Sequence, residues 1–141
     1  MKLITGVFLL LILWSCSQSP AEEVKVKKEF EMYKTSEMAS LMRQMHHINL
    51  QLKDKINAGE DLGDFPESFE QILVASMTDN KAMDDFFNSH ATSFLESQRK
   101  IYDNPSQAKN LFNEAVELCI ACHQVKCAGP IPKIEKLYIK N

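Results

Sequence analysis

The stretch NPSQAKNLFNEAVELCIACH, residues 104–123, decides the fold of this chain. Asn104 is placed to cap a helix, Pro105 to take its first position, and Gln107 to complete a pair resembling a capping box. Apolar and small residues then recur at helical spacing, namely Leu111, Phe112, Ala115, Val116, Cys119, Cys122 and His123. The stretch predicts an amphipathic helix that ends before Ala128-Gly129-Pro130 and carries two cysteines and a histidine on its core face.

The end of this helix, Cys119-Ile120-Ala121-Cys122-His123, has the C-x-x-C-H spacing that attaches a c-type haem. Two thiols three residues apart on one helical face can add to the two vinyl groups of one porphyrin, and the adjacent histidine can then bind the iron. A thioredoxin-like pair would instead lie at the start of a helix that follows a strand. A disulfide between Cys119 and Cys122 inside a helix has poor geometry. A zinc site that adds Cys127 to these three side chains stays an alternative.

The N-terminus has the features of an export signal. A positive start precedes the apolar run Leu3–Trp14, which is too short to span a membrane and fits the core of a signal peptide. The run ends at Leu13-Trp14-Ser15-Cys16, which resembles a bacterial lipobox. We therefore expect residues 1–15 to be removed and Cys16 to be lipidated, anchoring the protein to a membrane on the periplasmic side of the envelope. Cleavage near Ala21, or an uncleaved anchor, is the alternative.

The rest of the chain has the composition of one small helical domain. We expect a tether over 16–27, a helical domain over 28–127 and an extension over 128–141. The formal net charge is −3, and the two arginines are isolated, so nothing indicates binding to nucleic acid. Only four glycines are present, which argues against an all-β fold.

The apolar periodicity predicts helices at 28–58, 67–78, 81–102 and from 105 to the stop at 128–130. Gly59 is expected to end the first helix, and Asp79-Asn80 to cap the third. The second is expected to turn Phe69, Ile72, Leu73 and Met77 inward. Short loops then imply an all-α, antiparallel up-down-up-down four-helix bundle with a covalently bound haem inside it.

Two motifs resemble the cytochrome c-prime family, the class II cytochromes c. One is the C-x-x-C-H on the last helix, and the other is Tyr33-Lys34-Thr35-Ser36-Glu37-Met38, which is similar to the family's tyrosine–arginine–x–serine–x–(leucine or methionine) pattern. The resemblance spans roughly residues 25–127. It departs from the family at Cys127, where an arginine is common.

The resemblance implies a role for each matched residue. Cys119 and Cys122 would form the thioether bonds to the haem, and His123 would be the proximal iron ligand. Met38 would be the distal ligand of a low-spin iron, and Lys34 would lie near a haem propionate. Members of the family often form homodimers, so a homodimer is one expected assembly.

Two other side chains compete with Met38 for the distal position. Met42 lies one helical turn later and is the closest substitute. His90 lies on the apolar face of its helix. If residues 102 and 105 face each other across the loop, His90 lies about six residues, roughly 9 Å, from the level of His123. On that register we expect His90 to be a core or groove histidine.

These patterns indicate a haem-binding module that transfers single electrons near a membrane, and no enzyme with its own nucleophile or acid–base pair. His/Met ligation and membrane redox proteins as partners are expected. A five-coordinate iron that binds nitric oxide or carbon monoxide is the first alternative. A small zinc-stapled lipoprotein is the second.

Overall fold

The computed structural model describes residues 35–78 and 83–140, all within one compact unit, Tyr33–Asn141. The elements are α2 (Glu37–Ala58), η1 (Glu67–Leu73), α3 (Asp85–Asp103), η3 (Pro105–Gln107), α4 (Ala108–Lys126), α5 (Ile131–Ile134) and η4 (Glu135–Leu137), where η marks a 3₁₀ helix. These described ranges contain no strand, so the expectation of an all-α fold is confirmed for them. The predicted signal peptide, the predicted tether and the first two residues of the Tyr33–Met38 motif lie outside the described residues.

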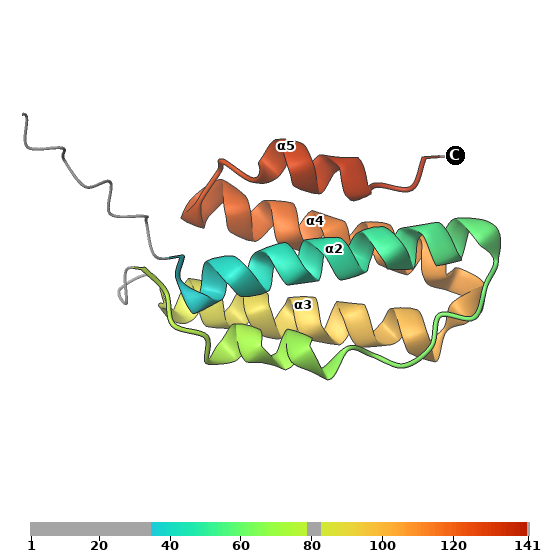
Figure 1. The fold of residues 1–141 in the computed structure, drawn as a ribbon, viewed down its shortest axis with the longest axis horizontal. Coiled ribbons are helices and arrows are strands. Elements are labelled where there is room, and N and C mark those ends of the chain that lie inside the picture. The colour runs from blue at the N-terminus through green and yellow to red at the C-terminus, as the bar shows by residue number, and fades with distance from the viewer. Residues whose placement is uncertain (1–34, 79–82, 141) are drawn as a thin grey trace, which may run out of the picture. The chain divides into compact units, whose positions relative to one another are not determined.

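Consecutive segments run in alternating directions (Figure 1). Helices α2 and α3 run the same way, η1 and α4 run the opposite way, and the C-terminal segment returns along α4. The most extensive contact is between α3 and α4, and α4 also touches α2 and the C-terminal segment. The end of α4 that carries the C-x-x-C-H motif therefore lies near the start of α2.

Helix α2 is set by its two caps. Ser36 is extended and accepts a hydrogen bond from Ala39 N at 3.2 Å, so the helix begins at Glu37. The helix was predicted to begin at residue 28. Residues 35 and 36 are not helical, so that prediction is wrong for these two positions, and residues 28–34 lie outside the described part. The predicted end is confirmed, because Gly59 adopts φ 67°, a left-handed conformation that favours glycine.

The predicted second helix is much shorter than expected. Only Glu67–Leu73 is helical, and it is a 3₁₀ helix with about three residues per turn. Phe69 and Ile72 therefore share one buried face with Ala75. The prediction that Leu73 points inward is wrong, since this side chain is 40 % exposed.

The two caps of the helix pair α3–α4 also differ from expectation. Asp84, rather than Asp79 or Asn80, caps α3 by accepting a hydrogen bond from Phe87 N at 2.9 Å. Asn104 donates its side-chain amide to Lys100 O, so it closes α3 instead of capping α4. The three residues after it form the separate 3₁₀ turn η3, and α4 starts only after that turn.

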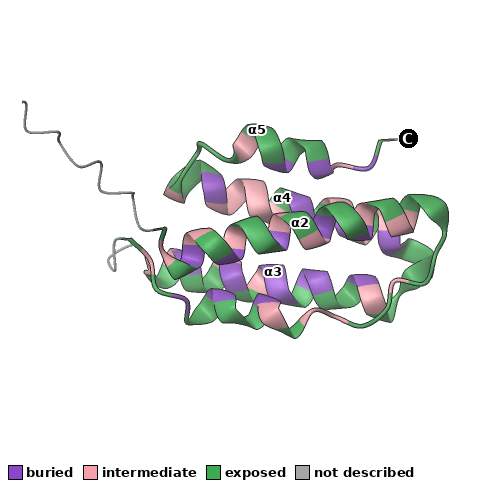
Figure 2. Ribbon diagram, in the orientation of Figure 1, coloured by how far each residue is buried: buried purple, intermediate pink, exposed green. Residues whose placement is uncertain are grey.

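The buried side chains form two clusters along the helices (Figure 2). The first, here the pocket cluster, contains Met38, Leu41, Met45, Phe69, Ile72, Ala75, Phe87, Ala91, Phe94 and Leu95. The second, here the C-terminal cluster, contains Leu52, Ile101, Ala108, Phe112, Ala115, Val116, Ile134, Leu137 and Ile139. Cys119 packs against both clusters, so the C-x-x-C-H motif begins where they meet.

The segment after residue 127 is part of the core. Ile134, Leu137 and Ile139 are buried in the C-terminal cluster. Asn113 holds the backbone of Ile139 from both sides, donating to its carbonyl oxygen at 3.0 Å and accepting from its N–H at 2.9 Å. None of the helices among the described residues is long and apolar enough to cross a membrane.

Candidate functional site

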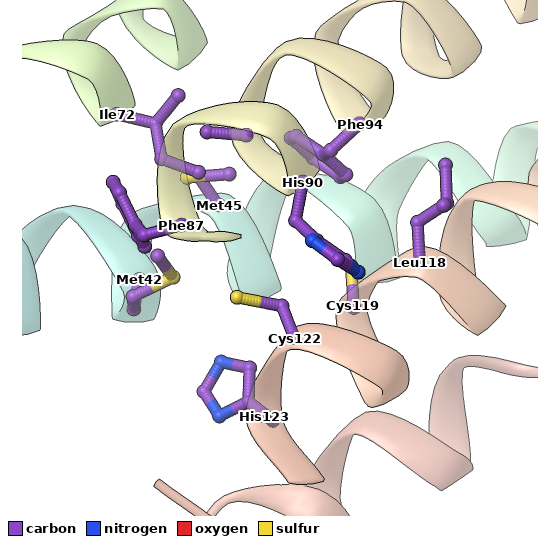
Figure 3. Close-up of a pocket in the computed structure, with 11 residues that line it drawn as sticks. Met42, Met45, Ile72, Phe87, His90, Phe94, Leu118, Cys119, Cys122 and His123 are labelled. Carbon is purple, nitrogen blue, oxygen red and sulfur yellow. The ribbon is translucent and has the colours of Figure 1, made fainter. Parts of the chain in front are cut away.

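A small, mostly apolar pocket that is partly open to solvent lies inside the pocket cluster (Figure 3). Its walls come from α2, η1, α3 and α4, and consist of Met42, Met45, Ile72, Phe87, His90, Ala91, Phe94, Leu118, Cys119, Cys122 and His123. The pocket therefore brings the C-x-x-C-H side chains of α4 together with apolar groups from three other segments.

Cys119 and Cys122 are half-buried on one face of α4 and both line the pocket. Burial, with a smaller contribution from Cys122, raises the pKa of the Cys119 thiol to about 12. Burial also raises the pKa of the Cys122 thiol. A redox-active C-x-x-C pair depends on a lowered thiol pKa, so these protonated thiols do not have the electrostatics of a thioredoxin-like site.

His123 is buried and its ring is held in one orientation. Its Nδ1 lies 3.1 Å from the carbonyl oxygen of Cys127 and 3.3 Å from the Cys127 Sγ. Because a carbonyl oxygen can only accept, Nδ1 carries the proton and Nε2 keeps its lone pair. Histidines that bind metals usually have this second hydrogen bond, which fixes the tautomer and the ring. Sequence reasoning left the role of Cys127 open, and the structure shows it as the partner of His123.

The methionines of α2 divide into two groups. Met38 is buried in the pocket cluster, and its backbone N–H donates to Ser76 O at 3.0 Å, but its side chain is not part of the pocket wall. Met42 and Met45 do line the pocket (Figure 3). Among the sequence candidates for a distal ligand, the substitute Met42 therefore faces the pocket and Met38 does not.

His90 also lines this pocket, from α3. Its Nδ1 lies 2.8 Å from the carbonyl oxygen of Phe86, and its ring stacks on the Phe86 ring with 3.9 Å between centroids. The expected 9 Å offset from the level of His123 assumed a tight loop between α3 and α4. The extra turn η3 changes that register, and sequence periodicity could not reveal it.

A basic side chain lies beside the site. Lys126 Nζ pairs with Asp84 Oδ2 at 2.6 Å and lies 5.5 Å from the centre of the Phe86 ring. The expected propionate contact Lys34 and the expected lipidation site Cys16 both lie outside the described residues. Lys126 is thus the described lysine that ties the end of α4 to the start of α3 next to Cys122.

The donor set suits a flat, apolar, covalently attached iron porphyrin. Two thiols on one helical face, an imidazole with its lone pair available and aromatic walls are the groups that such a cofactor requires. In the described ranges, no group of three or more histidine, cysteine, aspartate or glutamate side chains is arranged to hold a metal ion between them.

Comparisons of this chain with protein-family models, with curated proteins and with solved structures found no match.

Proposed function

We propose that this protein is a c-type haem protein that transfers single electrons, built as a four-helix haem bundle of the cytochrome c-prime kind. The observation that carries the proposal is that Cys119, Cys122 and His123 open onto one apolar pocket, with His123 Nδ1 bonded to a backbone carbonyl. A haem bound there would supply a one-electron redox centre. In this bundle the second segment is the short η1.

Each part of the site has a distinct task in this proposal. Cys119 and Cys122 would hold the cofactor through thioether bonds, and His123 would bind the iron through Nε2. Buried Phe87 and Phe94 would give the cofactor an apolar wall, which favours a redox centre of small reorganisation. The protein itself sets ligation, burial and access, and its own side chains perform no group transfer.

Electron transfer is favoured over gas binding by the side chains opposite the cysteines. Met42, Met45 and His90 line the pocket from α2 and α3, and each carries an atom that can ligate iron. A filled sixth position leaves no open site for nitric oxide or carbon monoxide. The gas-binding alternative requires all three, and the sequence candidate Met38, to stay away from the iron.

The membrane anchor is a separate part of the proposal. Lipidation of Cys16 would hold the protein on the periplasmic side of the envelope, next to membrane redox proteins that exchange electrons with it. Trp14 is the only tryptophan, so the mature chain should lack indole fluorescence. A Cys16→Ala variant should leave the membrane fraction or stall as precursor. A mature wild type that is soluble and carries no lipid mass would refute the anchor without touching the haem proposal.

The haem proposal is tested by exporting the full chain in a bacterium that matures c-type cytochromes. The purified protein should keep its haem through acid-acetone extraction and stain for haem on a denaturing gel. The double variant Cys119→Ser/Cys122→Ser should lose the stain. Cys127→Ser, which removes a neighbouring thiol but keeps the backbone carbonyl bonded to His123, should retain it. Colour that leaves with the solvent from the wild type would refute the proposal.

A further inference from the structure

The pocket contains a second histidine, held in the same way as His123 but on the neighbouring helix. We propose that His90 is the second axial ligand of the haem iron, so that α3 and α4 each supply one imidazole. This inference rests on the proposed function, because it presupposes a haem bound to Cys119 and Cys122. It replaces the methionine implied by the family resemblance with a histidine that the assumed helix register made a core or groove residue.

The hydrogen bond to His90 determines which ring nitrogen is available. Its Nδ1 lies 2.8 Å from the Phe86 carbonyl oxygen, which can only accept, so Nδ1 carries the proton. The lone pair is then on Nε2, as it is in His123. Stacking against the Phe86 ring fixes the plane of the imidazole as well. His90 therefore has both the tautomer and the restraint of a metal-binding histidine before any metal is present.

The same tautomer argues against a different role for His90. A distal histidine that stabilises a bound gas molecule does so by donating a hydrogen bond. Here the donor Nδ1–H is taken up by the backbone of its own helix, and Nε2 can only accept or ligate. Ligation of iron is the role that fits the free nitrogen of a His90 ring that lines an apolar pocket.

The register of the two helices brings His90 near the level of the motif. The ion pair between Asp84 and Lys126 aligns these two positions, and the facing helix ends Asp103 and Ala108 give nearly the same alignment. On that register His90 lies opposite residue 120, three residues from His123. Three residues correspond to about 4.5 Å along the axis, half the offset expected from sequence.

The thioethers of Met42 and Met45, which compete with His90 for the iron, are not pre-oriented in this way. Met45 is buried among the side chains of the pocket cluster, and Met42 is half-buried at its edge. A methionine has three rotatable side-chain bonds and a thioether sulfur that accepts hydrogen bonds only weakly, so neither sulfur is oriented as the His90 ring is. A pre-oriented ligand loses less freedom when it binds, which favours the imidazole. Two imidazoles would also give a lower reduction potential than a histidine and a methionine.

The test uses the exported full-length protein and reads the iron spectroscopically. Wild type should be low-spin in both oxidation states, should lack the weak near-infrared band of a thioether bound to ferric iron, and should resist carbon monoxide when reduced. His90→Ala should turn the ferric iron high-spin and let reduced protein bind carbon monoxide at once. Added imidazole should restore the low-spin spectrum of that variant. Met38→Ala, Met42→Ala and Met45→Ala should each keep the wild-type spectrum.

A second variant, which should gain a spectroscopic band, distinguishes loss of the ligand from misfolding. His90→Met should be low-spin and should acquire the near-infrared thioether band that wild type lacks, with helical content unchanged by circular dichroism. A thioether band in wild type, a high-spin wild type, or a His90→Ala variant that stays low-spin without added imidazole would overturn the inference while leaving the haem proposal intact. A wild type without covalent haem would overturn both.

Discussion

The two buried clusters of this protein differ in what their side chains are needed for. The C-terminal cluster consists of aliphatic and aromatic residues, and Ile101, Phe112 and Ala115 in it have no exposed surface. The pocket cluster, with two buried methionines, surrounds a cavity into which two histidines and two cysteines open. Close packing without strain is what stabilises a core, so the pocket cluster, which surrounds a cavity, is the less closely packed of the two.

The two clusters lie along the same helices, but one serves stability and the other forms the candidate site. Phe112 and Cys119 lie on one helix, two turns apart, yet one is sealed in the C-terminal cluster and the other borders the pocket. The buried side chains of the segment after residue 127 all belong to the C-terminal cluster. We infer that the C-terminal cluster carries the stability of the fold, and that the proposed haem would complete the packing of the pocket cluster.

The largest effect on stability should come from truncating a side chain in the C-terminal cluster. Phe112→Ala removes a ring with no exposed surface and should cost about 3–5 kcal/mol of unfolding free energy. The haem spectrum of this variant should stay as in wild type. Phe87→Ala is the matched variant in the pocket cluster, and it should cost less because its ring also faces the pocket. It should instead change the spectrum or the access of carbon monoxide. Urea unfolding measures the stability of the two variants, and absorption spectra report on the haem. If the variants lose equal stability and have the same spectrum, the two clusters do not differ in role.

A smaller effect is expected at the attachment of the C-terminal segment. Asn113→Ala leaves the N–H and the carbonyl oxygen of Ile139 without their side-chain partner, at a cost of about 1–3 kcal/mol. Asn110→Ala, at an exposed position of the same helix, is the control and should change stability little. The urea midpoints of the two variants decide the matter. If they coincide, the segment is not held by this pair of bonds.

The smallest effect concerns the ion pair beside the pocket and depends on pH. The hydrogen bond from Lys126, followed by that from Phe87 N, holds the pKa of Asp84 below its ordinary value of 3.8. A carboxyl group whose pKa is lower in the folded state binds protons more readily when unfolded. Its stabilising contribution is therefore complete above the ordinary value and disappears as the pH falls through the folded pKa.

Asp84→Asn isolates this contribution, because asparagine still caps α3 but cannot pair with Lys126 as an anion. The variant should be less stable than wild type at neutral pH, and the two should converge as the pH falls below 3.8. Asp85→Asn removes a charge from the same turn and should keep the wild-type loss of stability in acid. A wild type and an Asp84→Asn variant that stay parallel down to pH 2 would contradict this prediction.

The parts of the fold that sequence predicted are those with strong local signals. Apolar spacing identified the helical stretches around α2, α3 and α4, and Gly59 gave the end of α2 correctly. Where two signals competed, the prediction failed. Ser36 offers a cap inside what looked like one long apolar stripe, and Asn104 could close one helix or open the next.

The candidate site was predictable only on its own helix. The spacing of Cys119, Cys122 and His123 shows that they share a face, whatever the rest of the chain does. The groups facing them depend on helix register, which η3 shifts by about three residues, and on the 3₁₀ geometry of η1. Periodicity within one helix carries no information on either. Met38 was expected at the distal position from the family resemblance, and His90 was set aside on an assumed register, whereas His90 lines the pocket and Met38 does not.

The central claim, a haem bonded to both thiols of α4, is tested most directly by peptide mass spectrometry of the exported protein. Trypsin should release residues 110–126, which contain Cys119, Cys122 and His123, apart from residues 127–133, which contain Cys127. We predict that the first peptide carries one haem and resists alkylation, while the second carries none and is alkylated at its thiol. A first peptide that is free of haem and alkylated at both cysteines would contradict the account.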